Sequence, residues 1–147
     1  MIIVLCGPPG SGKTTIAQRL VQELGDARMI SSDWFKGRVY DRIFREVERR
    51  RGEERYLVLD ATFYRKAYRD RIREIASKRE EVLTVFIDCS LEVCLKRNSQ
   101  RQNPIPENAV HIMWKQFERS DDADMVINSD ETGVEQAVHA ILRRINP

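Results

Sequence analysis

The sequence has few of the residues that build metal sites, disulfide frameworks or membrane spans. Its 147 residues include 3 cysteines and 2 histidines, too few for a zinc site made by the protein alone. The cysteines, Cys6, Cys89 and Cys94, form no C-x-x-C pair, and we expect reduced thiols. The longest stretch without a charged side chain, residues 1–12, is too short to span a bilayer and lacks the cleavage site of a signal peptide. We therefore expect a cytoplasmic protein with no membrane partner.

The chain is also too short for two ordinary domains, so we expect a single domain over residues 1–147. Hydrophobic residues make up 41% and charged residues 33%, which is typical of a globular protein. The net charge of +2 hides an asymmetry. Residues 34–79 carry 15 basic and 8 acidic side chains, whereas residues 118–135 carry 1 basic and 7 acidic ones. Basic residues therefore dominate the middle of the chain.

Short apolar runs alternate with amphipathic helical patterns. Apolar strands between helices are typical of a parallel sheet covered on both faces. The sequence thus predicts an α/β fold, a three-layer sandwich with a five-stranded, mostly parallel sheet. The predicted strands are Ile2–Cys6, Ala27–Ser31, Tyr56–Asp60, Val82–Asp88 and Met125–Asn128. The predicted helices are Lys13–Leu24, Trp34–Arg51, Arg65–Lys78, Leu91–Arg101, Glu107–Arg119 and Gly133–Ile145, the last entered through a capping box at Thr132-Gly-Val-Glu135.

The strongest motif joins the first strand to the first helix. Residues 7–14, Gly-Pro-Pro-Gly-Ser-Gly-Lys-Thr, match the phosphate-binding loop G-x-x-x-x-G-K-[ST] in its required strand–loop–helix context. Its glycines let backbone N–H groups surround an anion at the positive end of the helix dipole. Lys13 is placed to reach the β- and γ-phosphates, and the Thr14 hydroxyl to hold Mg²⁺. The sequence thus predicts a P-loop NTPase fold that binds ATP and Mg²⁺ through Gly7, Pro8, Pro9, Gly10, Ser11, Gly12, Lys13, Thr14 and Thr15.

Two carboxylates follow the second and third predicted strands, at the sheet edge where ligands of such folds gather. Asp33 lies in the stretch Ser-Ser-Asp-Trp-Phe-Lys, and Asp60 lies in Leu-Val-Leu-Asp-Ala-Thr. A carboxylate there accepts a proton from an attacking hydroxyl, or holds Mg²⁺ through water beside Thr14. The alternatives are a helix N-cap for Asp33 and a strand-end turn for Asp60.

Two arginines four residues apart, Arg97 and Arg101, share one helix face and lead into an irregular stretch that contains two prolines. A mobile segment with arginines beside a phosphate site is typical of a lid, here about residues 97–106. Its closure excludes water and stabilises charge on the transferring phosphoryl group. The alternative is a solvated helix end, where arginine is favourable near the C-terminal dipole.

The order of these motifs resembles the small P-loop kinases that phosphorylate hydroxyls on RNA or DNA. The shared features are the phosphate loop, Ser-Asp-x-x-[Lys/Arg], Asp-x-Thr at a strand end, Lys-Arg-Asn-x-x-Arg, and Ile-Pro-Glu-Asn-Ala-Val at residues 105–110. The chain looks most like the kinase domains of polynucleotide 5′-kinases and of O-phosphoseryl-tRNA(Sec) kinase. It is less similar to adenylylsulfate and gluconate kinases.

The motifs and the resemblance together assign the site residues. The catalytic set is Lys13, Asp33, Arg97 and Arg101. The acceptor-binding set is Lys36, Asp60 and Thr62. The resemblance implies that Asp33 activates the acceptor hydroxyl. The chain departs from the family pattern at Lys36, where arginine is frequent, and at Phe63, where asparagine is usual.

Two predicted helices carry stripes of arginine, one of Arg38, Arg42, Arg45 and Arg49 and the other of Arg65, Arg69 and Arg73. A basic face beside the acceptor site suits a polyanionic substrate such as RNA or DNA. The alternative is a solvated face, because acidic residues stand at i, i+4 spacing to pair with the arginines. The same region holds four aromatic residues that either stack on bases or belong to the core, Trp34, Tyr40, Tyr64 and Tyr68.

These observations predict an ATP-dependent kinase that phosphorylates a hydroxyl, with a nucleic acid as the favoured acceptor. Two alternatives stay open from the sequence. One is a small-molecule kinase acting on adenylylsulfate, a sugar acid or a nucleoside. The other is a module whose ATP state regulates an RNA or protein partner without phosphate transfer. The sequence does not predict the oligomeric state.

Overall fold

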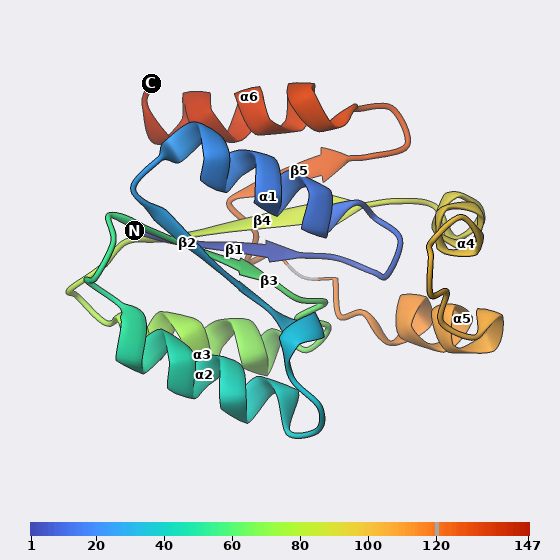
Figure 1. Cartoon of the computed structure of the whole chain (residues 1–147), viewed down its shortest axis with the longest axis horizontal. Helices are drawn as coiled ribbons and strands as arrows, with labels where there is room; N and C mark the ends of the chain where they lie inside the picture. The colour runs from blue at the N-terminus through green and yellow to red at the C-terminus, as the bar shows by residue number, and fades with distance from the viewer. Residues whose placement is uncertain (120) are drawn as a thin grey trace.

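A computed structural model describes residues 1–119 and 121–147 (Figure 1). In this described part the chain forms one parallel sheet of five strands in the order β2-β3-β1-β4-β5. The strands are β1 (Ile2–Cys6), β2 (Ala27–Ser31), β3 (Tyr56–Asp60), β4 (Val82–Asp88) and β5 (Met125–Asn128). The helices are α1 (Lys13–Leu24), α2 (Val39–Arg50), α3 (Lys66–Ala76), α4 (Leu91–Ser99), α5 (Glu107–Gln116) and α6 (Val134–Ile145), with a 3₁₀ turn η1 (Ser32–Trp34) after β2.

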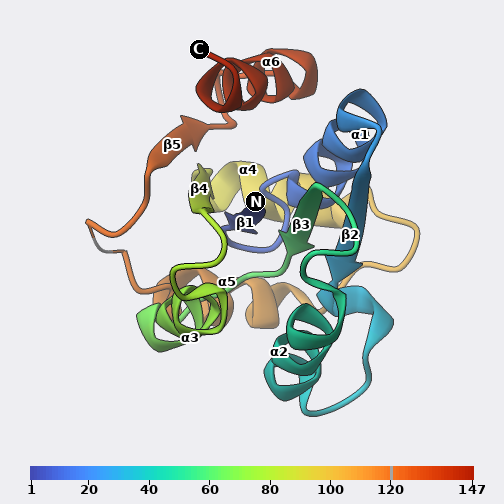
Figure 2. The same cartoon turned by 90° about the vertical axis from the view of Figure 1, so that its left-hand side faces the viewer.

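The helices form two layers around the sheet and a third group at its end. Helices α1 and α6 cover one face, and α2 and α3 cover the other (Figures 1 and 2). Helices α4 and α5 pack together beyond the carboxyl ends of the strands (Figure 1). This arrangement confirms the predicted three-layer sandwich and leaves the carboxyl edge of the sheet open to a ligand.

The pattern of β1 explains how one strand supports both layers. Ile2, Val4 and Cys6 pack into the core under α2 and α3, whereas Ile3 and Leu5 pack into the core under α1 and α6. All five residues are buried. Because successive side chains of a strand point to opposite faces, a central strand of this sheet is apolar throughout. The same reasoning gave all five strand ranges, which the structure confirms.

Five of the six helices differ from their predicted ranges, and α4 ends at Ser99, so Arg101 lies beyond it and does not share a helix face with Arg97 as predicted. Two further differences concern helix starts. The predicted helix from Trp34 to Arg51 is broken, because Gly37 and Arg38 both adopt positive φ, 73° and 48°. The chain therefore makes the turn η1 first and enters α2 at Val39. The second difference is at α6, where Gly133, and not Thr132, is the N-cap and its N–H donates to the Gln136 side chain.

The expectation of three reduced thiols is wrong for two of them. Cys89, which follows β4, and Cys94 in α4 form a disulfide. Only their sequence separation of five was visible beforehand. Cys89 precedes the N-cap Ser90 and Cys94 is the fourth residue of α4, and the turn of the chain into the helix leaves their Cα atoms 6.3 Å apart. Cys6 is free and buried, and burial raises the pKa of its thiol to about 12, so it stays protonated.

No helix among residues 1–119 and 121–147 is both long enough and apolar enough to cross a membrane.

Candidate active site

A pocket of about 600 Å³ lies at the carboxyl edge of the sheet, lined by the loop that follows β1, the turns after β2 and β3, and the end of α4 with the segment after it. Most of the predicted site residues meet in it, although they come from four separate segments, residues 9–15, 33, 60–62 and 97–101. The pocket is lined by Pro9, Gly10, Gly12, Lys13, Thr14, Thr15, Ser32, Asp33, Asp60, Thr62, Arg97, Gln100, Arg101, Ile105 and Met113.

Glycine is required in the loop by close contacts with other backbone segments. A Cβ at Gly7 would overlap the carbonyl oxygen of Ile87 at the end of β4. A Cβ at Gly10, where φ is 83°, would lie 2.5 Å from the carbonyl oxygen of Cys94 in α4. The Gly7 N–H donates to the Thr62 carbonyl at 3.1 Å. The loop is therefore wedged between β4, α4 and the turn after β3, which fixes its curvature.

Lys13 opens α1 and is buried beneath the loop. Its Nζ donates to the Pro8 carbonyl at 3.0 Å and to Ser11 Oγ at 3.4 Å. Burial lowers the pKa of Lys13 from its ordinary 10.5, and the charges of Asp60 and, to a lesser extent, Asp33 oppose this shift. A buried cation whose neighbours only partly offset its desolvation is suited to an anionic ligand such as a phosphate chain.

Asp60 ends β3 and is tied to two hydroxyls. Its Oδ2 accepts from Thr14 Oγ1 at 2.8 Å and from Ser31 Oγ at 3.0 Å. Asp33 lines the same pocket. These are hard oxygen donors without nitrogen or sulfur, which is the ligand set that Mg²⁺ prefers. The arrangement fits a Mg²⁺ ion held by Thr14, with Asp60 or Asp33 holding its water shell.

Asp33 lies in η1 with its side chain exposed. The N-cap of this turn is Ser31, whose Oγ accepts from the Asp33 N–H at 3.3 Å, and α2 begins only at Val39. Asp33 is therefore not the cap of α2, and the carboxylate lies at the pocket wall. Ser31 was missed in the sequence analysis, although its place beside Asp33 and at the end of β2 was a usable signal.

Arg97 reaches across from α4 to the phosphate loop. Its guanidinium donates to the carbonyls of Gly10 and Ser11 at 3.4 and 3.2 Å, and to the Ser129 side chain and carbonyl at 2.9 and 2.7 Å. Arg101 lines the pocket and is exposed. Arg97 thus joins the loop to the end of β5, and Arg101 is the arginine whose guanidinium lies nearer to solvent.

One side chain, that of Asn98, joins the two ends of the predicted lid. The buried Asn98 accepts from the Ile105 N–H at 3.1 Å and donates to the Ile105 carbonyl at 2.8 Å. The segment 99–104 between these two residues is exposed. This geometry makes residues 99–104 a loop with fixed ends that carries Arg101 above the pocket.

The turn after β3 holds Thr62 in the pocket through its neighbour. Phe63 adopts a φ of 47° and buries its ring completely. Its N–H donates to Tyr40 Oη at 2.9 Å, and its carbonyl accepts from Arg69 at 2.6 Å. Asparagine tolerates this left-handed conformation better than other residues. The asparagine that the resemblance leads us to expect here would therefore fit this backbone, and in this chain a buried ring takes its place.

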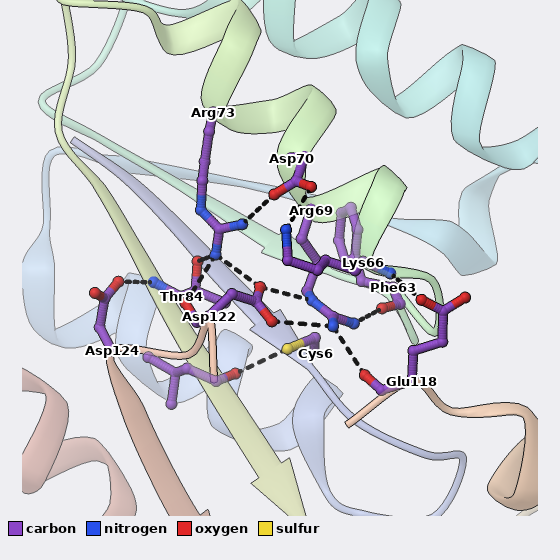
Figure 3. A network of polar contacts seen from close by, with 11 residues as sticks. Cys6, Phe63, Lys66, Arg69, Asp70, Arg73, Thr84, Glu118, Asp122 and Asp124 are labelled. Atoms are coloured by element: carbon purple, nitrogen blue, oxygen red, sulfur yellow. Dashed lines mark hydrogen bonds and ion pairs between the residues drawn. The ribbon is translucent and has the colours of Figure 1, made fainter. Parts of the chain in front are cut away.

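The second arginine stripe is structural, as the network in Figure 3 shows. Arg69 is 3% exposed and forms an ion pair with Asp122 at 2.9 Å. Arg73 pairs with Asp122 and Asp70, each at 2.9 Å, and donates to Thr84. These contacts bind α3 to the segment before β5. Arg69 and Arg73 are therefore held by tertiary contacts, which neither the nucleic-acid face nor the solvated face with i, i+4 pairs predicted.

The predicted site residues that do not line the pocket fall into two groups. One group belongs to the phosphate loop but does not line the pocket: Gly7, Pro8 and Ser11, of which the last two accept hydrogen bonds from Lys13 Nζ. Lys36 is exposed, beyond η1 and outside the pocket lining. The sequence analysis assigned no role to four further lining residues, although the first and third belong to motifs that it named: Ser32, Gln100, Ile105 and Met113.

The loop, the parallel sheet and the pocket together define a nucleotide-binding protein with the fold of P-loop kinases. A family model described as an AAA domain matches residues 2–120, and the chain belongs to this family.

Individual relatives are similar to part of the chain, and solved structures share its fold. The L-seryl-tRNA(Sec) kinase of Mus musculus is 37% identical over 65 residues, which cover 44% of this chain and 18% of the relative. The matched segment thus spans about a fifth of that protein's length. Two solved structures share the fold almost end to end: a sugar kinase from Janibacter sp. HTCC2649 (TM-score 0.81, 20% identity, 99% and 94% of the two chains) and Mycobacterium tuberculosis APS kinase in complex with AMPPNP and APS (TM-score 0.78, 15% identity, 99% and 97%).

Proposed function

We propose that this protein is an ATP- and Mg²⁺-dependent kinase that phosphorylates a hydroxyl on a nucleic acid, either a polynucleotide 5′-hydroxyl or a group linked to tRNA. The observation that carries the proposal is a group of four exposed cations just beyond Asp33: Lys36, Arg38, Arg42 and Arg45. We call this group the α2 basic surface. Within the described part of the chain, none of these four side chains forms an ion pair.

The position of the α2 basic surface links it to the acceptor side. The segment from η1 to the first turns of α2 lies at the carboxyl edge of the sheet, where the phosphate loop also lies (Figure 1). Residues 36–45 contain four basic side chains and one acidic one, Asp41, which gives a net charge of +3. Farther along α2, Arg49 and Arg50 pair with Glu46. Positive charge is therefore unpaired at the start of α2 and paired at its end, which suits a polyanion bound at the start of the helix.

In this proposal ATP is bound by the phosphate loop and by Lys13. Backbone N–H groups of the loop bind the phosphates, Lys13 neutralises the β- and γ-oxygens, and Thr14 with Asp60 holds Mg²⁺. The metal ion supplies charge neutralisation on the phosphates when bound. Arg97 keeps the loop in shape through Gly10 and Ser11, and Arg101 approaches the γ-phosphate when the loop 99–104 closes. This placement supports the catalytic assignment of Arg101 more directly than that of Arg97.

The acceptor side rests on Asp33. Its carboxylate accepts the proton of the acceptor hydroxyl as that oxygen bonds to the γ-phosphorus, while the bond from phosphorus to the β,γ-bridging oxygen breaks and ADP leaves. Thr62 and Lys36 contact the acceptor. Little covalent chemistry is asked of the protein, because alignment and charge stabilisation supply most of the rate.

The proposal is tested by offering ATP labelled at the γ-phosphate together with a panel of acceptors. The panel holds 5′-hydroxyl RNA and DNA oligonucleotides, seryl-tRNA, adenylylsulfate, gluconate and nucleosides. We expect label on a nucleic acid, with an acceptor KM that rises steeply between low and physiological salt. Label on a small molecule alone would overturn the nucleic-acid acceptor. Release of free phosphate with no labelled acceptor would overturn the kinase and favour the regulatory module.

A further inference from the structure

We propose that Trp34 is a stacking platform for the nucleobase nearest the reacting hydroxyl. This inference rests on the proposed function and names the contact by which the acceptor is recognised. Trp34 directly follows Asp33 in η1, and its side chain is 58% exposed. It is one of three large hydrophobic residues exposed in the described part of the chain, together with Ile112 and Val126.

The other aromatic residues of this region have structural partners. Tyr40 stacks on Tyr68 with ring centroids 3.9 Å apart, and Tyr64 packs edge-on against both at 6.0 and 5.5 Å. All three lie against the core under α2 and α3. They are therefore core residues, and the sequence-based hypothesis of base stacking survives for Trp34 alone.

A hollow of about 500 Å³ adjoins Trp34 on the outer side of β2. Met29, Ile30 and Phe35 give it an apolar lining, and β2 is an edge strand, so the hollow opens at the rim of the sheet. An apolar hollow beside an exposed indole suits a flat ring that stacks on one face. Such a ring would extend from a group held at Asp33, since adjacent residues line the hollow and the catalytic pocket.

The charges around the hollow favour a neutral base there and phosphates elsewhere. Arg28 pairs with Glu54 at 2.7 Å, and Arg50 pairs with Glu46 at 3.4 Å, so the cations in its wall are already neutralised. The unpaired cations belong instead to the α2 basic surface, which begins two residues after Trp34 at Lys36. A nucleotide chain matches this division, because its base is uncharged and its phosphates are anionic.

Fluorescence provides the first test, because the chain has 2 tryptophans. Trp114 donates its indole N–H to the Cys89 carbonyl, and Trp114→Phe leaves Trp34 as the single reporter. We expect a short 5′-hydroxyl oligonucleotide to quench this emission, and the same oligonucleotide with an abasic 5′-terminal nucleotide to quench it far less. Equal quenching by both oligonucleotides, or none by either, would overturn the stacking contact.

Kinetics provide the second test in the chain that keeps Trp114. We expect Trp34→Ala to raise the oligonucleotide KM by about 10-fold and Trp34→Tyr to restore most of the loss, with the KM for ATP unchanged. The matched control is Val126→Ala, which removes an exposed side chain (65%) from β5 at the other edge of the sheet. It should leave both KM values unchanged.

The abasic oligonucleotide separates stacking from a general effect. The wild-type protein should prefer the intact oligonucleotide over the abasic one by about 10-fold, and Trp34→Ala should not distinguish them. If Trp34→Ala still preferred the intact oligonucleotide over the abasic one as strongly as the wild type does, the stacking inference would be overturned. The proposed function would still stand as long as the wild type phosphorylates the oligonucleotide. If Trp34→Ala phosphorylated the oligonucleotide as well as the wild type but had a different sedimentation coefficient, its oligomeric state would have changed. That result would overturn the stacking inference and assign the hollow to a second copy of the chain.

Discussion

Phe63 shows how a single residue stores strain beside the site. Its φ of 47° costs about 1–2 kcal/mol for a side chain with a Cβ, and burial of the whole ring more than offsets this cost. The strain is kept because the backbone is held on both sides, by Tyr40 at the N–H and by Arg69 at the carbonyl. The preceding residue, Thr62, is thereby fixed against the phosphate loop.

Phe63→Asn tests this balance. Asparagine relieves the backbone strain but removes the buried ring, so we expect the free energy of unfolding to fall by about 2 kcal/mol. Urea denaturation measures the change. An unchanged or increased unfolding free energy would show that the ring contributes less than the conformation costs.

Lys13→Met tests the cost of the buried cation. Because burial lowers the pKa of Lys13, the charged form is disfavoured in the folded protein without ATP. We expect the unfolding free energy of the ATP-free variant to be unchanged or higher by about 1 kcal/mol, with ATP binding and phosphate transfer lost. Thermal unfolding with and without ATP measures both. A variant that is still stabilised by ATP would contradict the assignment of Lys13 to the phosphates.

At the scale of elements, α2 divides its charges along its length. The half near the pocket carries the unpaired α2 basic surface, and the far half carries the paired Arg49 and Arg50. The sequence predicted the stripe but not this division, because which carboxylate an arginine reaches depends on the tertiary structure. The late start of α2 has the same origin, since the positive φ of Arg38 has no signal in the pattern of hydrophobic residues.

Removal of two cations tests the role of α2. In Arg42→Ala/Arg45→Ala, we expect the slope of log KM for an oligonucleotide against log salt to fall by about 1.5, because two phosphate contacts are lost. The control is Arg143→Ala/Arg144→Ala at the end of α6, two exposed arginines on the opposite face of the sheet (Figure 1). It should leave the slope unchanged. If the slope fell by a similar amount in both variants, the change would reflect the lower net charge of the protein and not phosphate contacts made by α2.

At the scale of the molecule, the sequence predicted the sheet and the phosphate loop well because both depend on local patterns. The apolar strands gave the strand ranges, and the loop motif put Lys13 and Thr14 at the start of α1, where both line the pocket. The connections across the sheet were less accessible. The links from Arg97 to Ser129 and from Asp60 to Ser31 join segments 32 and 29 residues apart. The disulfide between Cys89 and Cys94 was not predicted, because we expected a cytoplasmic protein, in which thiols stay reduced.

The fold brings these distant parts to one edge of the sheet, where the residues proposed to bind ATP and those proposed to bind the acceptor line one pocket. The central claim is that Asp33 at this pocket directs the γ-phosphate of ATP to a nucleic-acid hydroxyl. The most direct measurement is single-turnover transfer of labelled γ-phosphate to a 5′-hydroxyl oligonucleotide by the wild type and by Asp33→Asn, with ATP affinity measured in both. The account predicts labelled oligonucleotide with the wild type, and transfer slower by about 100-fold or more in the variant at an ATP affinity within a few-fold of the wild type. Equal transfer by both proteins, or free phosphate as the only product of the wild type, would contradict it.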